Sequence, residues 1–340
     1  MTSLIEAILL GCALGFALQR GGFCGAALLS SAVLYKDLKG LAAILVAVTV
    51  SMVGFAVLAR LEWVIPNPNP LRLLSAIVGG LAFGAGMVLA GGCVTGTLYK
   101  MGEGRLTSML AAVGIGLGAL AVEGGALEPL KRALVTATRD VGGYAGLEEA
   151  VGLPYATAAG ILGAAGLLAL AIVAAVRRGS LRPPGWPSAE KLLRGGWSPA
   201  IVGALVGGLN WLAYLSSGAT GRNYPLGAHG GVKSAFSLLL RGEIGGSRWM
   251  LALVGGIVVG SAVSAAMRRD LKLRSADPAT LLFALLGGVL VGAGATIGHG
   301  CFMGNTISGL ALLSLHSVVF TACMVLANWG VTFVYLRGLR

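Results

Sequence analysis

The sequence predicts an all-α polytopic membrane protein of about nine long helices and four short re-entrant helices, arranged as an inverted internal repeat. Three observations predict this fold: an apolar composition, a duplicated glycine–cysteine segment, and an uneven distribution of basic residues between loops. Of the 340 residues, 56% are hydrophobic and 11% are charged, and the mean hydropathy is +0.86. Soluble domains carry about 25% charged residues. The composition therefore excludes a soluble globular enzyme, and it also excludes a disordered chain.

Glycine makes up 56 of the 340 residues without a period of three, which excludes a collagen-like chain. In an apolar chain, this much glycine indicates close helix contacts and broken helices. Apolar stretches predict nine long helices at residues 4–18, 40–59, 71–89, 106–122, 155–176, 199–215, 248–267, 279–297 and 316–336. Several are shorter than the ~20 residues that a full membrane span needs.

Four shorter stretches follow glycine-rich turns, at residues 24–35, 93–100, 230–240 and 301–313. They are too short to cross a bilayer, so we interpret them as re-entrant half-helices that line a cavity inside the protein. The order long, short, long, long, short, long occurs in residues 1–122 and again in residues 199–340. Residues 123–198 are expected to form a periplasmic loop, one connecting transmembrane helix and a basic cytoplasmic loop. That single connecting helix inverts the second repeat relative to the first, a common plan in transporters.

The duplication is visible in the sequence itself. Residues 79–96 (GGLAFGAGMVLAGGCVTG) align without gaps with residues 287–304 (GGVLVGAGATIGHGCFMG), and 8 of the 18 positions are identical. A weaker copy occurs at residues 15–25 (GFALQRGGFCG). The corresponding part of the second half, residues 218–231, has the glycines but no cysteine.

The formal net charge of +12 divides unevenly between the two faces of the predicted topology. The loops on the face opposite the N-terminus hold 16 basic and 5 acidic residues, and the other face is left with a net charge of +1. By the positive-inside rule, the face opposite the N-terminus is cytoplasmic, so we expect the C-terminus in the cytoplasm and the N-terminus on the outer, periplasmic side of the membrane. The positive charge thus reports orientation, and we expect a lipid bilayer and no nucleic acid as partner.

Three of the five cysteines share one local setting. Cys24, Cys93 and Cys301 each lie where a glycine-rich turn opens a short helix. A helix start offers free N–H groups and the positive end of the dipole, which together favour an anion. The glycines Gly22, Gly92 and Gly300 let a ligand approach the backbone closely.

A thiol is a weak donor and a polarizable acceptor. Several weak sites in series suit permeation, because the ion must also leave each site. A soft thiol suits a soft sulfur-containing anion. The alternative is that each cysteine is only a small apolar core residue, as we expect for Cys12 and Cys323.

Other polar residues near these turns leave two interpretations open. His299 could tune Cys301, bind an anion, or only pack and cap. Thr97 and Asn305 occupy equivalent repeat positions, and each could bond the substrate or its own helix turn. The residues Arg222, His229 and Lys233 of the cysteine-free loop could attract anions from outside or simply be solvated.

The sequence contains no nucleotide-binding motif, no catalytic triad setting and no metal-ligand spacing, so we expect no enzyme activity, no catalytic residues, no metal and no cofactor. Glu6 is the one carboxylate within a predicted long helix, which gives little support to a proton relay built from acidic residues.

The motifs GGFCGA around Cys24, AGGCVTGTLYKMGEG around Cys93 and GHGCFMGNTISG around Cys301 resemble the YeeE/YedE family of bacterial inner-membrane thiosulfate transporters, over nearly the whole chain. The resemblance implies an hourglass-like fold. It also implies that thiosulfate passes by transient hydrogen bonds to three essential cysteines, which map to Cys24, Cys93 and Cys301. A small cytosolic TusA-like sulfur-carrier protein is an implied partner, and another sulfur or selenium anion stays open as substrate.

We therefore expect Cys24 and Cys93 on loops that enter from inside and Cys301 on one that enters from outside, converging near the membrane midplane. A membrane thiol oxidoreductase or sulfurtransferase is the rival interpretation. It requires two cysteines within disulfide reach. A scaffold subunit without transport is a third.

Overall fold

A computed structural model gives the structure of the chain, and it describes residues 2–137, 146–147, 152–178 and 196–337. Within these ranges the fold is helical and contains no strand. The first half holds α1 (Thr2–Gly21), α2 (Gly25–Leu34), α3 (Lys39–Arg60), α4 (Leu73–Leu89), α5 (Val94–Gly102) and α6 (Leu106–Val122). The second half holds α11 (Pro199–Gly218), α12 (His229–Arg241), α13 (Arg248–Met267), α14 (Pro278–Ile297), the π-helix η1 (Phe302–Gly309) and α15 (Leu315–Arg337). Between the halves lie α7 (Glu128–Thr136) and α9 (Tyr155–Arg178).

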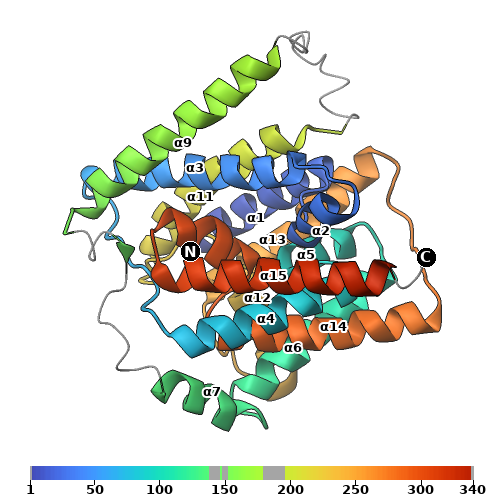
Figure 1. Ribbon diagram of the computed structural model, residues 1–340. Coiled ribbons are helices and arrows are strands. Elements are labelled where there is room, and N and C mark those ends of the chain that lie inside the picture. Colours follow the sequence, from blue (N-terminus) through green and yellow to red (C-terminus); the bar gives the residue numbers. More distant parts are fainter. Residues whose placement is uncertain (1, 138–145, 148–151, 179–195, 338–340) are drawn as a thin grey trace.

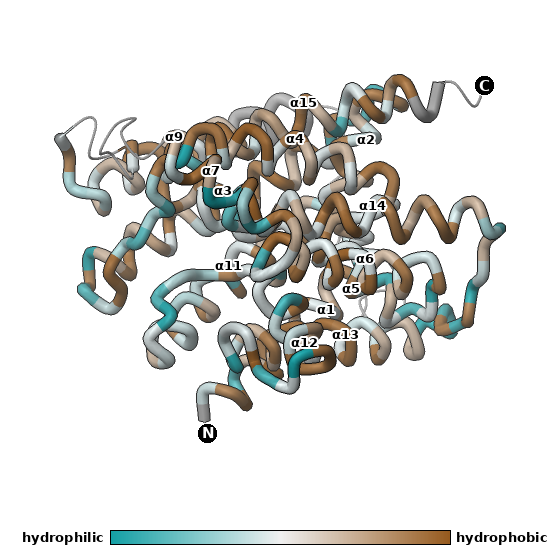
Figure 2. Tube along the Cα trace, turned by 90° about the horizontal axis from the view of Figure 1, so that it is seen from below, coloured by the Kyte–Doolittle hydropathy of each residue, from teal (hydrophilic) through white to brown (hydrophobic). Residues whose placement is uncertain are grey.

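The nine long helices predicted from the sequence are all present. Seven helical stretches are long and apolar enough to cross a membrane, and Leu106–Val122 and Tyr155–Ala171 are shorter apolar helices. The helices lie side by side as one bundle (Figure 1). Hydrophobic residues follow the helices, and hydrophilic residues collect in the turns at the two ends of the bundle (Figure 2). The chain is thus a polytopic, multi-pass membrane protein, as its composition predicts.

Two elements differ from the prediction. Helix α7 is not predicted, because its nine residues mix apolar with charged types and none of them is buried, so they form no continuous apolar stretch. The last short helix is a π-helix over residues 302–309, in which the N–H of Leu310 bonds the carbonyl of Asn305. A π-helix has i→i+5 bonding and is rare outside functional sites. Apolar patterning does not distinguish it from an α-helix.

The duplicated glycines have duplicated contacts. On α4, Gly80 lies against Phe320 and Gly84 against Met324 of α15. At the equivalent positions of α14, Gly288 lies against Ala111 and Gly292 against Ile115 of α6. In both pairs the residue numbers rise together, so the helices run parallel at a distance that leaves no room for a side chain.

The two copies of the glycine segment also face each other. Gly79 of α4 lies against Gly294 and Gly298 at the far end of α14, whereas Gly86 lies against Gly287 and Val291. The numbers run in opposite senses, so α4 and α14 are antiparallel. Because these helices are copies of each other, the second half is inverted relative to the first. The packing of α1 on α13 and of α3 on α11 follows the same exchange of halves.

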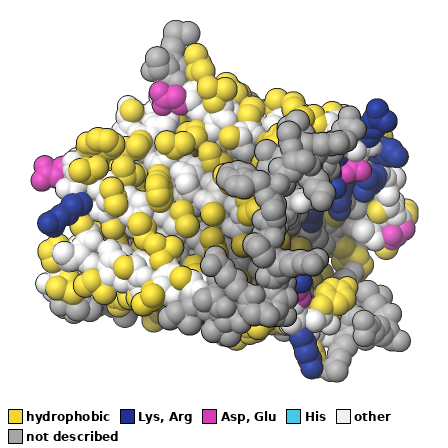
Figure 3. All heavy atoms as spheres, turned by 90° about the horizontal axis from the view of Figure 1, so that it is seen from above, with side chains coloured by type: hydrophobic (Ala, Val, Ile, Leu, Met, Phe, Trp, Pro, Cys, Tyr) yellow, Lys and Arg dark blue, Asp and Glu magenta, His cyan; other side chains and the backbone are white. Residues whose placement is uncertain are grey.

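The short helices lie within the bundle. Helix α5 packs on α13 of the other half, α12 packs on α6, and α2 packs on α15. Cys24, Cys93 and Cys301 belong to the largest buried hydrophobic cluster, together with Phe302 and Met303. The surface in Figure 3 is largely hydrophobic or uncharged along the bundle, whereas Lys and Arg side chains gather at the end that carries the turn from α13 to α14.

Candidate functional site

The three cysteines are the N-cap residues of three short helices: Cys24 caps α2, Cys93 caps α5 and Cys301 caps η1. All three have extended backbone conformation, are at most 1% exposed and are free thiols. The Sγ atom of Cys93 accepts a hydrogen bond of 3.4 Å from the N–H of Gly96. Each thiol therefore lies at the end of its helix where unpaired N–H groups gather.

The starts of these helices meet. A β-carbon at Gly96 would collide with Sγ of Cys24 and would lie 3.4 Å from Sγ of Cys93, so both sulfur atoms face this glycine. The turn of Cys24 reaches the third helix through Gly25, whose Cα packs on the ring of Phe302. The fold thus brings together three helix starts that are up to 277 residues apart in the chain.

One cavity ends at Cys301. It has a volume of about 220 Å³, which exceeds the ~30 Å³ of one water several-fold and admits a five-atom anion. We call it the Cys301 cavity; it is lined by Asn69, Arg222, Tyr224, Gly227, His229, Gly230, Met250, His299, Gly300, Cys301 and Gly304. Cys24 and Cys93 do not line it. Phe302, the neighbour of Cys301 in the chain, is 1% exposed, and its ring packs on Gly25, the neighbour of Cys24.

Arg222 gives the Cys301 cavity an unbalanced positive charge. Its guanidinium lies over the rings of Trp249 and Tyr224, at 5.3 and 5.6 Å from their centroids. Nη1 donates to the carbonyls of Tyr224 and Pro225, at 2.8 and 2.9 Å. In the described part of the chain, no carboxylate pairs with it. Aromatic stacking and carbonyls hold the cation without neutralising it, which favours an anionic ligand.

His299 stands between two cavities. It lines the Cys301 cavity and also a second one of about 380 Å³ beneath α7, where Arg72, Lys131 and Arg132 are among the lining residues. Nη1 of Arg72 lies 2.7 Å from Nε2 of His299. The backbone of His299 is left-handed, with φ of +54°. The structure thus holds this ring at the wall of both cavities in a conformation that few non-glycine residues adopt.

Thr97 and Asn305 have different surroundings, although they occupy equivalent positions. Oγ1 of Thr97 is buried beside Gly92 and has no hydrogen-bond partner in the described part of the chain. The amide of Asn305 is engaged, because Nδ2 donates to the carbonyl of Gly298 at 2.9 Å and Oδ1 accepts from Ser317. Thr97 therefore has a free hydroxyl, whereas Asn305 stabilises the turn before its own helix.

The glycines of the site also differ. Gly22 has φ of +58°, and a β-carbon there would meet open space. A β-carbon at Gly92 would lie 3.1 Å from Oγ1 of Thr97, and one at Gly300 would lie 3.0 Å from the amide of Asn305. Gly92 and Gly300 therefore allow a close approach, and Gly22 allows a turn.

Sequence reasoning did not identify Asn69, Tyr224 and Met250 as lining residues. Nδ2 of Asn69 donates to the hydroxyl of Tyr224 at 3.3 Å, and that hydroxyl donates to the carbonyl of Gly304. The run PNPNP at residues 66–70 was the available signal, since such a loop cannot continue either neighbouring helix.

Arg20 lies on the side of the first cysteine turn, four residues before Cys24. Its side chain is buried and stacks on Phe16, with Cζ 4.8 Å from the ring centroid. Within the described residues, none of its three guanidinium nitrogens has a hydrogen-bond partner. Arg20 thus differs from Arg222, whose Nη1 donates to two carbonyls. No cluster of metal-ligating side chains occurs within the described residues.

The chain is similar to several known proteins. A family model described as sulphur transport matches residues 20–330. The thiosulfate transporter TsuA of Spirochaeta thermophila is 32% identical over 337 residues, which cover 97% of this chain and 98% of the relative. The thiosulfate transporter TsuA of Escherichia coli is 29% identical over 99% of this chain and 96% of its own length. The probable transporter YedE of Escherichia coli is 31% identical over 29% of this chain and 24% of its own length.

Proposed function

The chain belongs to the sulphur transport family, and from this premise we propose that it imports thiosulfate across the cell inner membrane. Its N-terminus is periplasmic and its C-terminus cytoplasmic, as the basic residues at one end of the bundle favour (Figure 3). The observation that carries the proposal is the meeting of three cysteine-capped helix starts inside a chain that is similar over 97% of its length to a thiosulfate transporter.

The neutral thiols of Cys301, Cys24 and Cys93 pass the anion along by weak hydrogen bonds. Each thiol donates to an oxygen or sulfur of thiosulfate, and the neighbouring helix N–H groups add the positive field of a helix start. A thiolate would repel the anion. Because each contact is weak, no single site retains the substrate.

The proposed path begins in the Cys301 cavity, on the periplasmic side. Arg222 attracts the anion there, and Cys301 receives it. The contact between Phe302 and Gly25 separates this cavity from Cys24, so it must open for each passage. Beyond it, the free hydroxyl of Thr97 and the unpaired guanidinium of Arg20 support release toward the cytoplasm.

Import of a dianion requires an energy source. Each charge moved across 100 mV changes the free energy by ~2.3 kcal/mol. Because the cell interior is negative, a dianion that moves inward alone must overcome this free energy for each of its two charges. Rapid consumption inside, for which a TusA-like sulfur-carrier protein is the proposed partner, or a co-transported cation would offset it.

The test is thiosulfate uptake by cells that lack other importers. Replacing Cys24, Cys93 or Cys301 with alanine should lower uptake at least tenfold, and the matched control Cys323→Ala, within α15, should not. Normal uptake by the triple alanine variant would exclude the relay. Flux into liposomes that contain only the purified chain excludes a scaffold role, and competition with sulfite, sulfide and selenium anions defines selectivity.

A thiol oxidoreductase or sulfurtransferase is the second candidate, because Cys24 and Cys93 both face Gly96. Mass spectrometry of the protein after exposure to thiosulfate tests it. A substrate-dependent persulfide or a disulfide between Cys24 and Cys93 would favour this activity over simple passage.

A further inference from the structure

All three histidines of the chain gather around the Cys301 cavity, although they are up to 87 residues apart. His229 and His299 line it. His316 lies behind His299, with their ring centroids 5.9 Å apart. Histidine is the side chain that titrates nearest neutral pH, so the cavity collects every such group that the chain has.

Two of these rings have their nitrogens occupied by fixed groups. Nε2 of His316 donates to the carbonyl of Gly298 at 2.9 Å, and its Nδ1 accepts from the backbone N–H of Arg72 at 3.4 Å. His299 accepts from the guanidinium of Arg72 through Nε2. A guanidinium can donate hydrogen bonds but cannot accept them, so it opposes protonation of the nitrogen that accepts from it.

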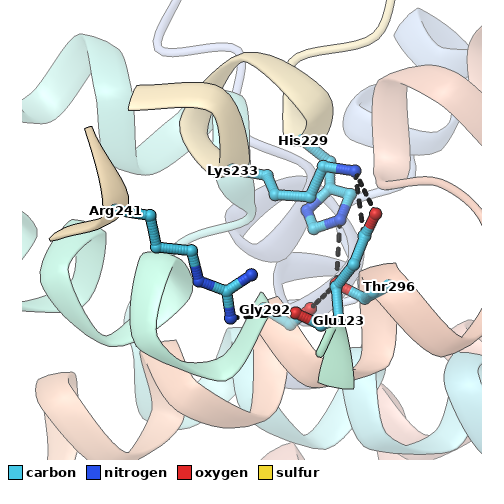
Figure 4. Close-up of polar contacts among 6 residues, drawn as sticks. All are labelled: Glu123, His229, Lys233, Arg241, Gly292 and Thr296. Carbon is cyan, nitrogen blue, oxygen red and sulfur yellow. Dashed lines mark hydrogen bonds and ion pairs between the residues drawn. The ribbon is translucent and has the colours of Figure 1, made fainter. Parts of the chain in front are cut away.

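His229 is different, as Figure 4 shows. The hydroxyl of Thr296 donates its one proton to the carbonyl of Gly292 at 2.8 Å. Its oxygen must therefore accept from Nε2 of His229, which lies 3.0 Å away. This fixes the proton of the neutral ring on Nε2. Nδ1 is left as a bare, buried acceptor, with no partner among the residues that the structure describes.

While the cavity is empty, the charges around His229 oppose protonation of its imidazole ring. Lys233, one turn further along α12, pairs with Glu123 at the end of α6, at 2.8 and 2.9 Å (Figure 4). The backbone carbonyl of Glu123 also accepts from Arg241. The other charged or titratable groups toward the ring are Lys131 of α7, Arg222 and Tyr224 of the preceding loop, and His299 and Cys301 across the cavity. Unpaired cations predominate, so the ring stays neutral until an anion arrives.

We propose that Nδ1 of His229 takes up a proton from the outside when thiosulfate enters the Cys301 cavity, and releases it to water on the inner side when the anion moves past the contact between Phe302 and Gly25. This rests on the proposed transport function. The dianion supplies the negative charge that the cavity lacks, and this charge stabilises the protonated ring. Binding of the anion and of the proton are then linked, so each strengthens the other. One proton per dianion also halves the net charge that moves against the membrane potential.

The first test is calorimetric binding of thiosulfate to the purified full chain, in buffers of different ionisation enthalpy. Thiosulfate itself stays a dianion near neutral pH. We expect the wild type to take up as much as one proton per anion and to lose affinity by up to tenfold per pH unit on the alkaline side. His229→Gln keeps the donor to Thr296 but cannot titrate, so its affinity should be independent of pH and its proton uptake zero.

Two matched variants keep the result interpretable. Thr296→Val frees the ring but keeps its basic nitrogen, and His299→Gln removes the other cavity-lining imidazole, so both should still take up a proton. Purified variants are compared by thermal unfolding first. A wild type that binds thiosulfate with no proton uptake and equal affinity from pH 6.5 to 8.5 would overturn this inference while leaving the transport proposal intact. Absence of any binding and flux would instead contradict the transport proposal.

The second test uses liposomes that contain the purified chain and a pH-sensitive dye inside, with the membrane potential clamped by potassium and valinomycin. External thiosulfate should acidify the interior in the wild type and leave its pH unchanged with His229→Gln. Thiosulfate entry without acidification in the wild type would contradict co-transport.

Discussion

His299 and Gly91 occupy equivalent positions of the two repeats and share one backbone conformation, with φ of +54° and +66°. Glycine adopts this left-handed conformation at no steric cost, whereas other residues are strained there by ~1–3 kcal/mol. The second repeat thus keeps the turn of the first but places an imidazole on it. Arg72 and the two cavities are what that imidazole contacts.

Replacing His299 with glycine should therefore separate stability from transport. The substitution relieves the backbone strain, so the unfolding temperature should stay equal or rise. It also removes the hydrogen bond that the ring makes to thiosulfate, a contribution of ~1.4 kcal/mol, so thiosulfate affinity should fall about tenfold. The measurements are thermal unfolding and uptake at several thiosulfate concentrations. Gly91→Ala is the matched control: it adds strain at an open position and should lower the unfolding temperature. A large loss of stability in His299→Gly would contradict the strain argument.

Arg222→Gln should raise the KM for uptake by at least tenfold, because a charge-assisted contact to the anion contributes ~1.5–3 kcal/mol. Arg222→Lys should recover part of this loss, since it keeps the charge but not the planar stacking on Trp249 and Tyr224. The exposed Arg248 nearby provides the control Arg248→Gln, for which KM should change less than twofold. Equal effects at both positions would indicate only a diffuse surface charge.

The contact between Gly25 and Phe302 predicts a pair of compensating substitutions. A β-carbon at residue 25 would lie 2.8 Å from the ring of Phe302. Gly25→Ala should therefore create a steric clash that hinders the opening of this contact, and it should reduce uptake at least tenfold. Adding Phe302→Leu supplies room and should restore much of it. The double-mutant comparison of the four chains isolates the coupling. Independent, additive losses would show that this contact does not control passage.

The ion pair of Glu123 with Lys233 predicts a pH dependence at the acid end. Burial works to raise the pKa of Glu123, but the hydrogen bonds and charge of Lys233 outweigh it, so the pKa lies below its usual value. A lowered folded pKa stabilises the fold above the unfolded pKa, and this stability is lost as pH falls through the folded pKa. Unfolding temperature should therefore drop on acidification, and Glu123→Gln should lower it at neutral pH while reducing its slope below pH 5. The neighbouring exposed pair gives the control Glu128→Gln, with little effect at neutral pH.

Much of the fold follows from the sequence for a physical reason. Gly80, Gly84, Gly288 and Gly292 repeat because parallel helices touch at each of them, and a side chain would force the helices apart. Close helix packing can therefore be predicted directly from the positions of the glycines. The same reasoning identified the three cysteine turns, because a glycine run and a thiol at a helix start are both local features.

The remainder of the site depends on distant contacts. Met250 reaches the Cys301 cavity from a helix whose own sequence carries no sign of it, and Asn69 reaches it from a loop marked only by its run of prolines. The free hydroxyl of Thr97 and the engaged amide of Asn305 follow from the different neighbours of two equivalent positions. The bare nitrogen of His229 depends on where the Thr296 proton goes. Hydrogen-bond partners across the fold determine these properties, and periodicity does not record them.

The antiparallel copies α4 and α14 raise the question of how the two ends of the protein differ. A backbone built from two exchanged halves presents nearly the same architecture to either side of the bilayer, so it cannot by itself define a direction. Any chemical difference between the two ends must reside in the few side chains that break the exchange. The starts of α2, α5 and η1 carry a cysteine, whereas the start of α12 carries Ala228 and His229. Three thiols and one imidazole at the starts of these four related helices make the two ends of the symmetric scaffold chemically different.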